Sequence, residues 1–310
     1  EAYRKIRNTA RIIMANLGDF DPDRDLMPVD KLLDIDRWAL TRLNSLIATA
    51  RNGYDTYQFH LVYHAVNNFC TIDMSKLYID ITKDRVYVEK SDSPARRSAQ
   101  SAMYRIINAL DRIIAPMLAF TAEEIWQAIP HEGDALIVAK WPEYSEDRAF
   151  PAEEKAIETI KEAVRGIRNI RTEMNVAPSR KASVYVVSEN DEIRKIFEDG
   201  KLFFASLAYA NEIMIQADKT GIADDAVSVV IPGATLYIPF AELVDIAQEI
   251  ERLKKEQKRL EGELARSKGM LSNERFLSKA PEAKIAEEKE KLAKYEQMME
   301  QVTKRLEQLA

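Results

Sequence analysis

Apolar residues recur at helical spacing through the first 130 positions of the chain. In residues 34–53, for example, Leu40, Leu43 and Ile47 fall on one face of a helix. The segments that show this spacing are 1–17, 34–53, 56–81, 95–115 and a last one that starts near residue 120. We therefore predict an all-α helical bundle over residues 1–130.

The last of these helices carries a local start signal, FTAEEI, at residues 120–125. Thr121 and Glu124 have the spacing of a capping box, in which each side chain accepts a hydrogen bond from the other residue's backbone amide. Phe120 and Ile125 have the spacing of a hydrophobic staple across the first turn. The pattern predicts that the helix starts at this point.

The periodicity changes beyond residue 150. Residues 152–174 form another predicted helix, but 182–188 and 212–217 have the short, β-branched character of strands. Residues 227–240 are apolar on both sides of Pro232-Gly233, a sequence typical of a hairpin turn. Two short helical segments, 190–198 and 200–209, lie between the strands. We predict a connecting helix and a small α+β subdomain over 131–241.

The C-terminal segment has two runs of heptads. One extends from Leu243 to Leu271 and the other from Ile285 to Leu309, each with apolar positions that alternate by three and four. Between them Pro281 fits the first turn of a new helix. We predict an antiparallel coiled-coil hairpin over 242–310, with pairing between two chains as the alternative. The expected fold class is therefore mainly α.

The amino-acid composition argues against several classes of protein. No run of 18 apolar residues is present, and the single cysteine, Cys70, excludes an intramolecular disulfide framework. The net charge of −6 argues against a uniformly basic nucleic-acid-binding protein. The acidic excess lies in residues 129–248, with 13 basic against 21 acidic side chains. A polyanion would therefore meet local basic patches at the two ends of the chain.

The first helix contains such a patch. Arg4, Arg7 and Arg11 share one face at positions i, i+3 and i+7, with Asn8 beside them. Like charges at this spacing repel and cost an isolated helix about 0.2–0.5 kcal/mol per pair. Either the face is solvated, or an anion binds there.

A second group lies in YIDITKDRVYVEK, residues 78–90. Lys83 and Arg85 could contact phosphates, with Tyr78 or Tyr87 as a stacking platform for an unpaired base. The alternative is a helix end with ordinary pairs between acidic and basic residues.

The predicted helix 152–174 carries a third group, in which Lys161, Arg165 and Arg168 follow at i, i+4 and i+7. Glu158 and Glu162 are close enough to neutralise part of it, so a solvated face is an equal alternative.

The tip of the C-terminal hairpin is more distinctive, because residues 266–279 hold four basic side chains against the single acid Glu274. The basic residues are Arg266, Lys268, Arg275 and Lys279.

Metal binding and nucleophilic catalysis have little support. His60 and His64 have the i, i+4 spacing of a metal pair, but no third ligand has a recognisable spacing. We expect both histidines, with Phe59 and Tyr63, to pack in the helical core. Cys70 has no nucleophile elbow or oxyanion loop around it. The sequence predicts no metal site and no catalytic residue.

About 128 residues at the start of the chain contain four long motifs: YRKIRNTARIIMANLGDFDP, LDIDRWAL, FHLVYHAVNNFCTIDMSKLYIDITKDRVY and IAPMLAFTAEEIWQ. Over about 1–128 these motifs resemble the anticodon-binding domain of isoleucyl-tRNA synthetase. The rest of the chain contains three further motifs: HEGDALIVAKWPEY, IRNIRTEMNVAPSRKA and LSNERFLSKAPEAKIAEEKEKL. Over about 131–310 these resemble the C-terminal part of valyl-tRNA synthetase, with its coiled-coil arm. Both enzymes are class I aminoacyl-tRNA synthetases. Such a mosaic is compatible with a natural lineage or an engineered fusion.

The resemblance implies a function for this chain. The parent enzyme would join isoleucine or valine to its tRNA with ATP and Mg²⁺. The signature sequences of class I catalysis are missing here, so catalysis would belong to a domain before residue 1, and no cofactor is expected in this chain. The bundle would meet the anticodon stem and loop, and the arm would lie against the outer corner of the tRNA. We expect a cytoplasmic monomer; the alternative is a non-enzymatic scaffold that binds proteins through its coiled coil.

Overall fold

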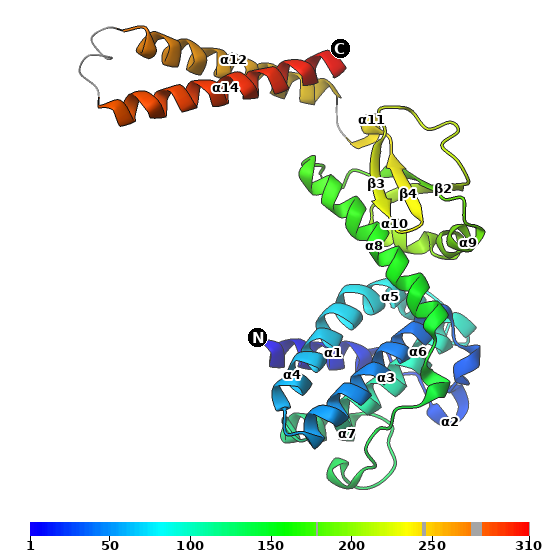
Figure 1. The fold of residues 1–310 in the computed structure, drawn as a ribbon. Coiled ribbons are helices and arrows are strands. Elements are labelled where there is room, and N and C mark those ends of the chain that lie inside the picture. The colour runs from blue at the N-terminus through cyan, green and yellow to red at the C-terminus, as the bar shows by residue number, and fades with distance from the viewer. Residues whose placement is uncertain (178, 244–245, 274–280, 310) are drawn as a thin grey trace.

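The computed structural model describes residues 1–177, 179–243, 246–273 and 281–309. Figure 1 shows a helical bundle at one end, a small sheet with its helices in the middle, and a long helical hairpin at the other end. Helix α8 (Pro151–Glu173) runs from the bundle to the sheet. No helix within the described residues is both long and apolar enough to span a membrane.

The bundle contains each helical segment that the sequence predicts. Its elements are α1 (Ala2–Ala15), the short helices α2 (Pro22–Asp25) and η1 (Val29–Lys31), α3 (Asp34–Asp55), α4 (Phe59–Asn68), η2 (Phe69–Tyr78), α5 (Ile79–Tyr87), α6 (Pro94–Ile114) and α7 (Ala119–Ala128). The segment predicted as one helix over 56–81 is three consecutive elements and continues to Tyr87. Its middle element, η2, is a π-helix. Trp38 on α3 and Trp126 on α7 are fully buried.

The predicted capping box at the start of α7 is wrong. The Leu118 carbonyl already accepts a hydrogen bond from the Ala122 amide at 2.9 Å, so the helix begins before Thr121. The Thr121 hydroxyl instead lies 3.2 Å from the hydroxyl of Tyr3, with which it hydrogen bonds. Phe120 is 91% exposed and forms no staple. A local sequence signal was overridden here by the position of the preceding turn.

A buried carboxylate holds four elements of the bundle together. Asp36 on α3 accepts hydrogen bonds from the Tyr78 hydroxyl at 2.8 Å and from the Ser98 hydroxyl at 2.6 Å. Arg85 on α5 adds two more, at 2.8 and 2.9 Å. The Asp36 side chain is 0% exposed and the Arg85 side chain 13%. Because a buried charge is costly unless it is paired and hydrogen-bonded, this network fixes η2, α5 and α6 against α3.

The middle part is a four-stranded mixed sheet with order β2-β1-β4-β3. Strands β1 (Ala182–Val187) and β2 (Ala210–Gln216) are parallel and are connected through α9 (Asp191–Asp199) and α10 (Lys201–Leu207). Strands β3 (Val227–Ile231) and β4 (Ala234–Ile238) form the predicted hairpin around Pro232-Gly233. Gly233 has φ +80°, which a residue with a side chain rarely adopts. The α+β prediction is confirmed. The loop between α7 and α8 contains only two short turns, η3 (Leu136–Val138) and η4 (Glu146–Arg148).

Helix α8 is fixed to both of its neighbours. Near its start Glu153 pairs with Arg37 of α3 at 3.1 Å, and Glu154 pairs with Arg42 of α3 at 3.1 Å. Farther along, Gly166 faces β3 so closely that a Cβ there would lie 2.3 Å from a methyl group of Val229. The helix therefore sets the position of the sheet relative to the bundle.

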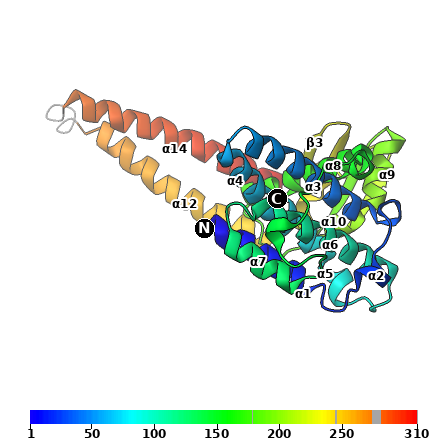
Figure 2. The same ribbon diagram turned by 90° about the horizontal axis from the view of Figure 1, so that it is seen from below.

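After the short helix α11 (Phe240–Leu243), two long helices form the hairpin: α12 (Ile246–Leu271) and α14 (Glu282–Leu309). They lie side by side and run in opposite directions (Figures 1 and 2). Leu253, Leu260 and Ser267, which follow one another at intervals of seven residues, are buried. The Ser267 hydroxyl donates to Glu288 at 2.7 Å across the pair. The two heptad runs thus pack against each other within one chain.

Candidate RNA-binding surfaces

Helix α1 is fixed to the bundle through one face. Ile6 and Ile13 are buried, and the Thr9 hydroxyl is 3.3 Å from the Cys70 carbonyl, to which it donates, and 3.2 Å from the Ser75 hydroxyl on η2. The opposite side of α1 is exposed. It carries the four residues singled out in the sequence, Arg4, Arg7, Asn8 and Arg11. We call these four residues the α1 stripe.

The α1 stripe is not neutralised by any ion pair within the described residues. Within the described part of the chain, no acidic side chain pairs with Arg4, Arg7 or Arg11. Lys5 on the same helix, by contrast, pairs with Glu1 at 3.2 Å. Repulsion between the arginines is therefore left uncompensated inside the protein, which makes this surface able to accept an anion.

The second predicted group does not form one surface. Lys83 is exposed and pairs with Asp80 at 2.9 Å, and Tyr87 is exposed nearby. Arg85 instead points into the bundle and holds Asp36. Tyr78 is fully buried, so it cannot stack on a base as the sequence analysis suggested. Only Lys83 and Tyr87 remain accessible to a ligand here.

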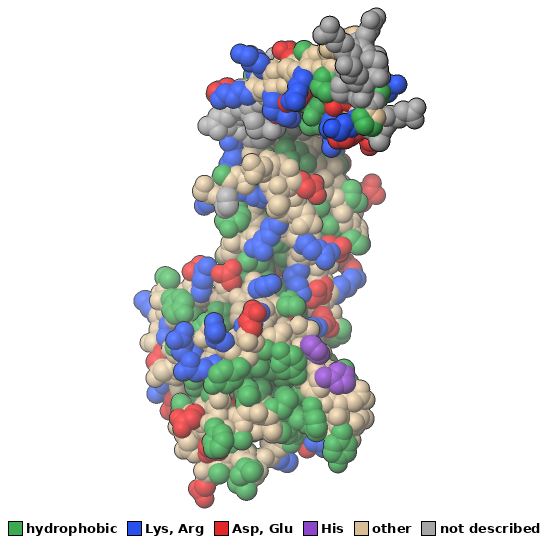
Figure 3. All heavy atoms as spheres, turned by 90° about the vertical axis from the view of Figure 1, so that its left-hand side faces the viewer, with side chains coloured by type: hydrophobic (Ala, Val, Ile, Leu, Met, Phe, Trp, Pro, Cys, Tyr) green, Lys and Arg blue, Asp and Glu red, His purple; other side chains and the backbone are tan. Residues whose placement is uncertain are grey.

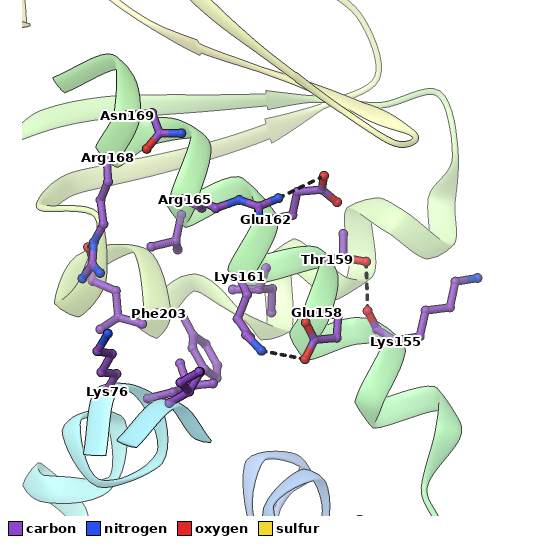
Figure 4. Close-up of a pocket in the computed structure, with 15 residues that line it drawn as sticks. Lys76, Lys155, Glu158, Thr159, Lys161, Glu162, Arg165, Arg168, Asn169 and Phe203 are labelled. Atoms are coloured by element: carbon purple, nitrogen blue, oxygen red, sulfur yellow. Dashed lines mark hydrogen bonds and ion pairs between the residues drawn. The ribbon is translucent and has the colours of Figure 1, made fainter. Parts of the chain in front are cut away.

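The third group lines a groove of about 600 Å³ between η2, α8 and α10. Figure 4 shows its labelled side chains. Arg165 pairs with Glu162 at 3.6 Å, and Arg168 donates from Nε to the Leu207 carbonyl at 2.7 Å. Both side chains are exposed. The next arginine of the helix, Arg171, is buried and donates to backbone carbonyls, so the basic stripe ends at Arg168.

The fourth group is only partly described. Arg266 and Lys268 are exposed on α12, and Lys268 pairs with Glu296 of α14 at 3.1 Å. Arg275 and Lys279 lie outside the described residues. Figure 3 shows one face of the molecule, with Lys and Arg side chains over the upper bundle and the narrower part above it, and hydrophobic side chains across the lower bundle.

The histidines and the cysteine do not form a reactive site. His60 and His64 are exposed, as are Phe59 (49%) and Tyr63 (45%), because α4 turns Val62 and Val66 toward the core instead. The prediction that these side chains pack in the core is wrong. Among the described residues, no group of three metal-ligating side chains is present.

Cys70 is fully buried, and this burial raises the pKa of its thiol to about 12, although a contact with Thr9 acts in the opposite direction. The nucleophilic thiolate is therefore scarce at neutral pH.

The groove is also lined by Lys76 on η2 and Lys155 on α8, which no sequence pattern indicated. They are about 80 residues apart in the chain, and neither belongs to a periodic basic pattern. Only the packing of α8 beside η2 brings them to one surface, so no local signal could have identified them.

The chain matches two known protein families. Residues 36–186 match the anticodon-binding domain of tRNA ligase, and residues 245–310 match the valyl tRNA synthetase tRNA binding arm. The first match includes α3 to β1 and therefore both η2 and α8, while α1 precedes it and packs on η2. Residues 36–186 are thus similar to the anticodon-binding domains of tRNA ligases. Two walls of the groove, η2 and α8, therefore lie within the matched residues, and the third, α10, follows them in the chain.

Curated relatives point the same way. The chain is 56% identical over 132 residues to the Isoleucine--tRNA ligase of Syntrophotalea carbinolica, covering 43% of this chain and 14% of that protein. It is 43% identical over 198 residues to the enzyme of Moorella thermoacetica, covering 62% and 21%. It is 38% identical over 242 residues to the enzyme of Thermotoga maritima, covering 76% of this chain and 26% of that protein.

These alignments add two facts. The chain spans only about a quarter or less of the length of these three relatives. An alignment over 76% of the chain also means that similarity to isoleucine ligases extends beyond the first 128 residues, farther than the sequence analysis expected. The valyl-type match is confined to the arm.

Proposed function

We propose that this chain is the tRNA-recognition part of an isoleucine- or valine-type tRNA ligase. The observation that carries the proposal is the α1 stripe, an unneutralised basic surface packed directly on an anticodon-binding domain. Both sides of that contact, Thr9 on α1 and Ser75 on η2, are fixed by hydrogen bonds. The negatively charged phosphates of an RNA backbone would neutralise the arginines of the stripe.

In this proposal the α1 stripe holds phosphates of the anticodon loop and sets its register. Unpaired bases can then be read on their edges or stacked on an aromatic side chain. Asn8 carries an amide that can donate and accept, and Tyr87, close in sequence to Lys83, offers an exposed ring. Arg85 is not included, because its guanidinium is paired with the buried carboxylate of Asp36.

The other parts of the chain would extend the contact with tRNA. We propose an anticodon-binding bundle over 1–130, a connecting helix and α+β subdomain over 131–241, and a coiled-coil arm over 242–310. Arg266 and Lys268 on the arm, with Arg275 and Lys279 near its tip, would meet the outer corner of the tRNA. The pairing of α12 with α14 inside one chain supports a monomer rather than a dimeric scaffold.

We also propose that the parent protein charges tRNA with its amino acid, using ATP and Mg²⁺ in a catalytic part that this chain does not contain, and that it does so in the cytoplasm. The identity of the relatives favours isoleucine over valine. The present chain should therefore bind tRNA without aminoacylating it.

The test is a comparison of two double variants. Arg7→Gln/Arg11→Gln removes two charges from the α1 stripe, and Lys31→Gln/Arg51→Gln removes two exposed charges elsewhere on the bundle. Each phosphate contact with a single strand contributes about 0.7 to the slope of log affinity against log salt concentration. We expect the first variant to lose about two contacts and the control to retain the wild-type slope. Equal slopes in all three proteins, with unchanged circular dichroism, would disprove the assignment.

The amino acid specificity needs a separate measurement. Gel shifts with isoleucine and valine tRNAs, and with their anticodons exchanged, would show which anticodon the chain prefers. We expect affinity to follow the anticodon rather than the body of the tRNA. Affinity that ignores the exchange would place recognition on the arm instead.

A further inference from the structure

A cavity of about 450 Å³ lies at the end of the bundle that is farthest from the sheet, beside the loop between α7 and α8 (Figure 1). It is lined by the end of α6, the start of α7 and residues 136–141 of the loop. Most of its walls are apolar and come from Ala115, Pro116, Ala119, Leu136, Ile137 and Ala139. Small-molecule sites have volumes of about 300–1,000 Å³ and apolar walls with a few polar groups, so this cavity has the size and lining of such a site.

The walls of the cavity are held in place by contacts within the bundle. The Leu136 amide donates to the carboxylate of Glu123 at 3.1 Å and so ties the loop to α7. At the other end of this stretch, the Trp141 ring packs edge-on against Tyr54, with 5.4 Å between the ring centres. The Tyr54 hydroxyl in turn donates to the Ile113 carbonyl at 2.8 Å. A preformed site avoids the cost of ordering its side chains when a ligand arrives.

Arg112 is the one basic side chain among the described residues that line the cavity. Its guanidinium carbon lies 5.1 Å from the centre of the buried Trp126 ring. None of the described acidic side chains forms an ion pair with it, and its Nε is buried without a hydrogen-bond partner. Burial lowers the pKa of Arg112, and the acids nearby do not compensate for this effect. The guanidinium is therefore stacked and partly dehydrated but has no counter-charge of its own.

The two closest candidates for that counter-charge are already accounted for. Asp111 is fully buried, and burial raises its pKa to about 8, so most of this acid is neutral at pH 7. Glu123 accepts hydrogen bonds from the Leu136 amide and, at 2.8 Å, from the Gln127 side chain. Its carboxylate thus holds the loop and does not pair with Arg112.

We propose that this cavity binds a small organic acid, with the carboxylate on the terminal nitrogens of Arg112 and the apolar body against the helix ends and the loop. A guanidinium offers paired donors that match a carboxylate, and stacking on an aromatic ring fixes the plane in which they lie. The apolar walls favour an aliphatic or aromatic acid, because a sugar or a phosphate would leave polar groups there without partners. The site shares no residue with the surfaces assigned to tRNA, so it goes beyond the proposed function.

The probe for this site is 4-phenylbutyrate, which joins an apolar body to one carboxylate. Its neutral amide, 4-phenylbutanamide, and the cation 4-phenylbutylamine have nearly the same shape. The chain has three tryptophans, and their indole N–H signals in a ¹H–¹⁵N NMR spectrum report separate places. We expect 4-phenylbutyrate to shift the signal of Trp141 in a saturable way and to leave that of Trp38, at the other end of α3, unchanged. The amide should bind about tenfold more weakly, because it lacks the charge that Arg112 recognises.

Variants of the chain locate the two halves of the interaction by isothermal titration calorimetry. Arg112→Gln should weaken binding of 4-phenylbutyrate about tenfold, whereas Lys31→Gln, which removes an exposed cation elsewhere on the bundle, should leave it unchanged. Ala119→Phe should abolish binding, because Ala119 is exposed at the start of α7 and a larger side chain there would fill the cavity without entering the core. Circular dichroism checks that each variant is folded.

Several results would overturn the assignment. The absence of any shift at Trp141, or equal affinity for the acid and its amide, would show that no carboxylate is recognised in the cavity. Tighter binding of 4-phenylbutylamine than of the acid would mean that Glu123 selects the ligand instead of Arg112. If anticodon-loop RNA displaces 4-phenylbutyrate, and Arg112→Gln weakens both ligands equally, the cavity belongs to RNA and the inference is wrong. None of these results changes the test of the α1 stripe, so the proposed function stands or falls separately.

Discussion

Helices α1 and α5 both present arginines, but the fold uses them in opposite ways. Arg85 on α5 forms an ion pair with the fully buried carboxylate of Asp36, and this pair helps to hold the helices of the bundle together. Arg7 and Arg11 on α1 are exposed, and no acidic side chain in the described part of the chain forms an ion pair with either. The same residue type is therefore structural in one helix and available to a ligand in the other, and the difference lies in what the rest of the chain places opposite it.

The strongest test of this comparison is removal of the paired arginine. Arg85→Met would leave the Asp36 carboxylate buried without its cation, and breaking a buried pair in this way costs about 3–5 kcal/mol. We expect a loss of that size in the free energy of unfolding, measured by urea denaturation at neutral pH. Lys83→Met, two residues away on the same helix but exposed, should change stability by less than about 0.5 kcal/mol. A similar small loss for Arg85→Met would contradict the structural role.

A buried acid without a partner sharpens the comparison from the other side. Asp111 on α6 is as buried as Asp36, but neither of its oxygens has a hydrogen-bond partner among the described residues. Burial raises its pKa to about 8, with Arg112 opposing the shift and Glu123 adding to it. The folded protein thus prefers the neutral acid. The stability that this group contributes is complete at low pH and declines as pH rises from about 4, the usual value, to about 8.

The variant Asp111→Asn should remove this part of the pH dependence. Between those two pH values we expect wild type to lose stability relative to the variant, by up to about 1.4 kcal/mol for each pH unit. Urea denaturation of both proteins at several pH values measures the difference. Parallel curves for the two proteins would show that Asp111 ionises normally.

The smallest effect is expected at the α1 stripe. Arg7→Gln/Arg11→Gln removes repulsion and no ion pair, so it should leave the protein equally stable or stabilise it by a few tenths of a kcal/mol. Thermal unfolding beside the RNA-binding measurement checks this. A clear loss of stability would mean that the stripe supports the fold, and its effect on RNA binding would then be indirect.

The sequence predicts elements better than it predicts partners. The hairpin around Pro232-Gly233 and the helix over 95–115 follow from local pattern and are found within a residue or two. The amphipathic pattern of α1 also places its arginines on the exposed side. The role of Arg85 could not be predicted, because Asp36 lies 49 residues away and only folding brings the two together.

Two errors have the same physical origin. The start of α7 is set by the turn after α6, which the spacing of Thr121 and Glu124 does not encode. Phe59 and Tyr63 look like core residues by composition, but α4 is packed through Val62 and Val66 instead. In both cases a local preference gives way to tertiary packing.

The burial of Cys70 makes this chain convenient for labelling. With no exposed thiol and almost no thiolate at neutral pH, the native protein should react slowly with maleimides. A single cysteine introduced on the exposed side of α1 would therefore carry a fluorophore without background from the natural residue. In the unlabelled chain, the rate at which Cys70 reacts would instead report how often the bundle opens, because the thiol becomes reactive only when α1 and η2 separate.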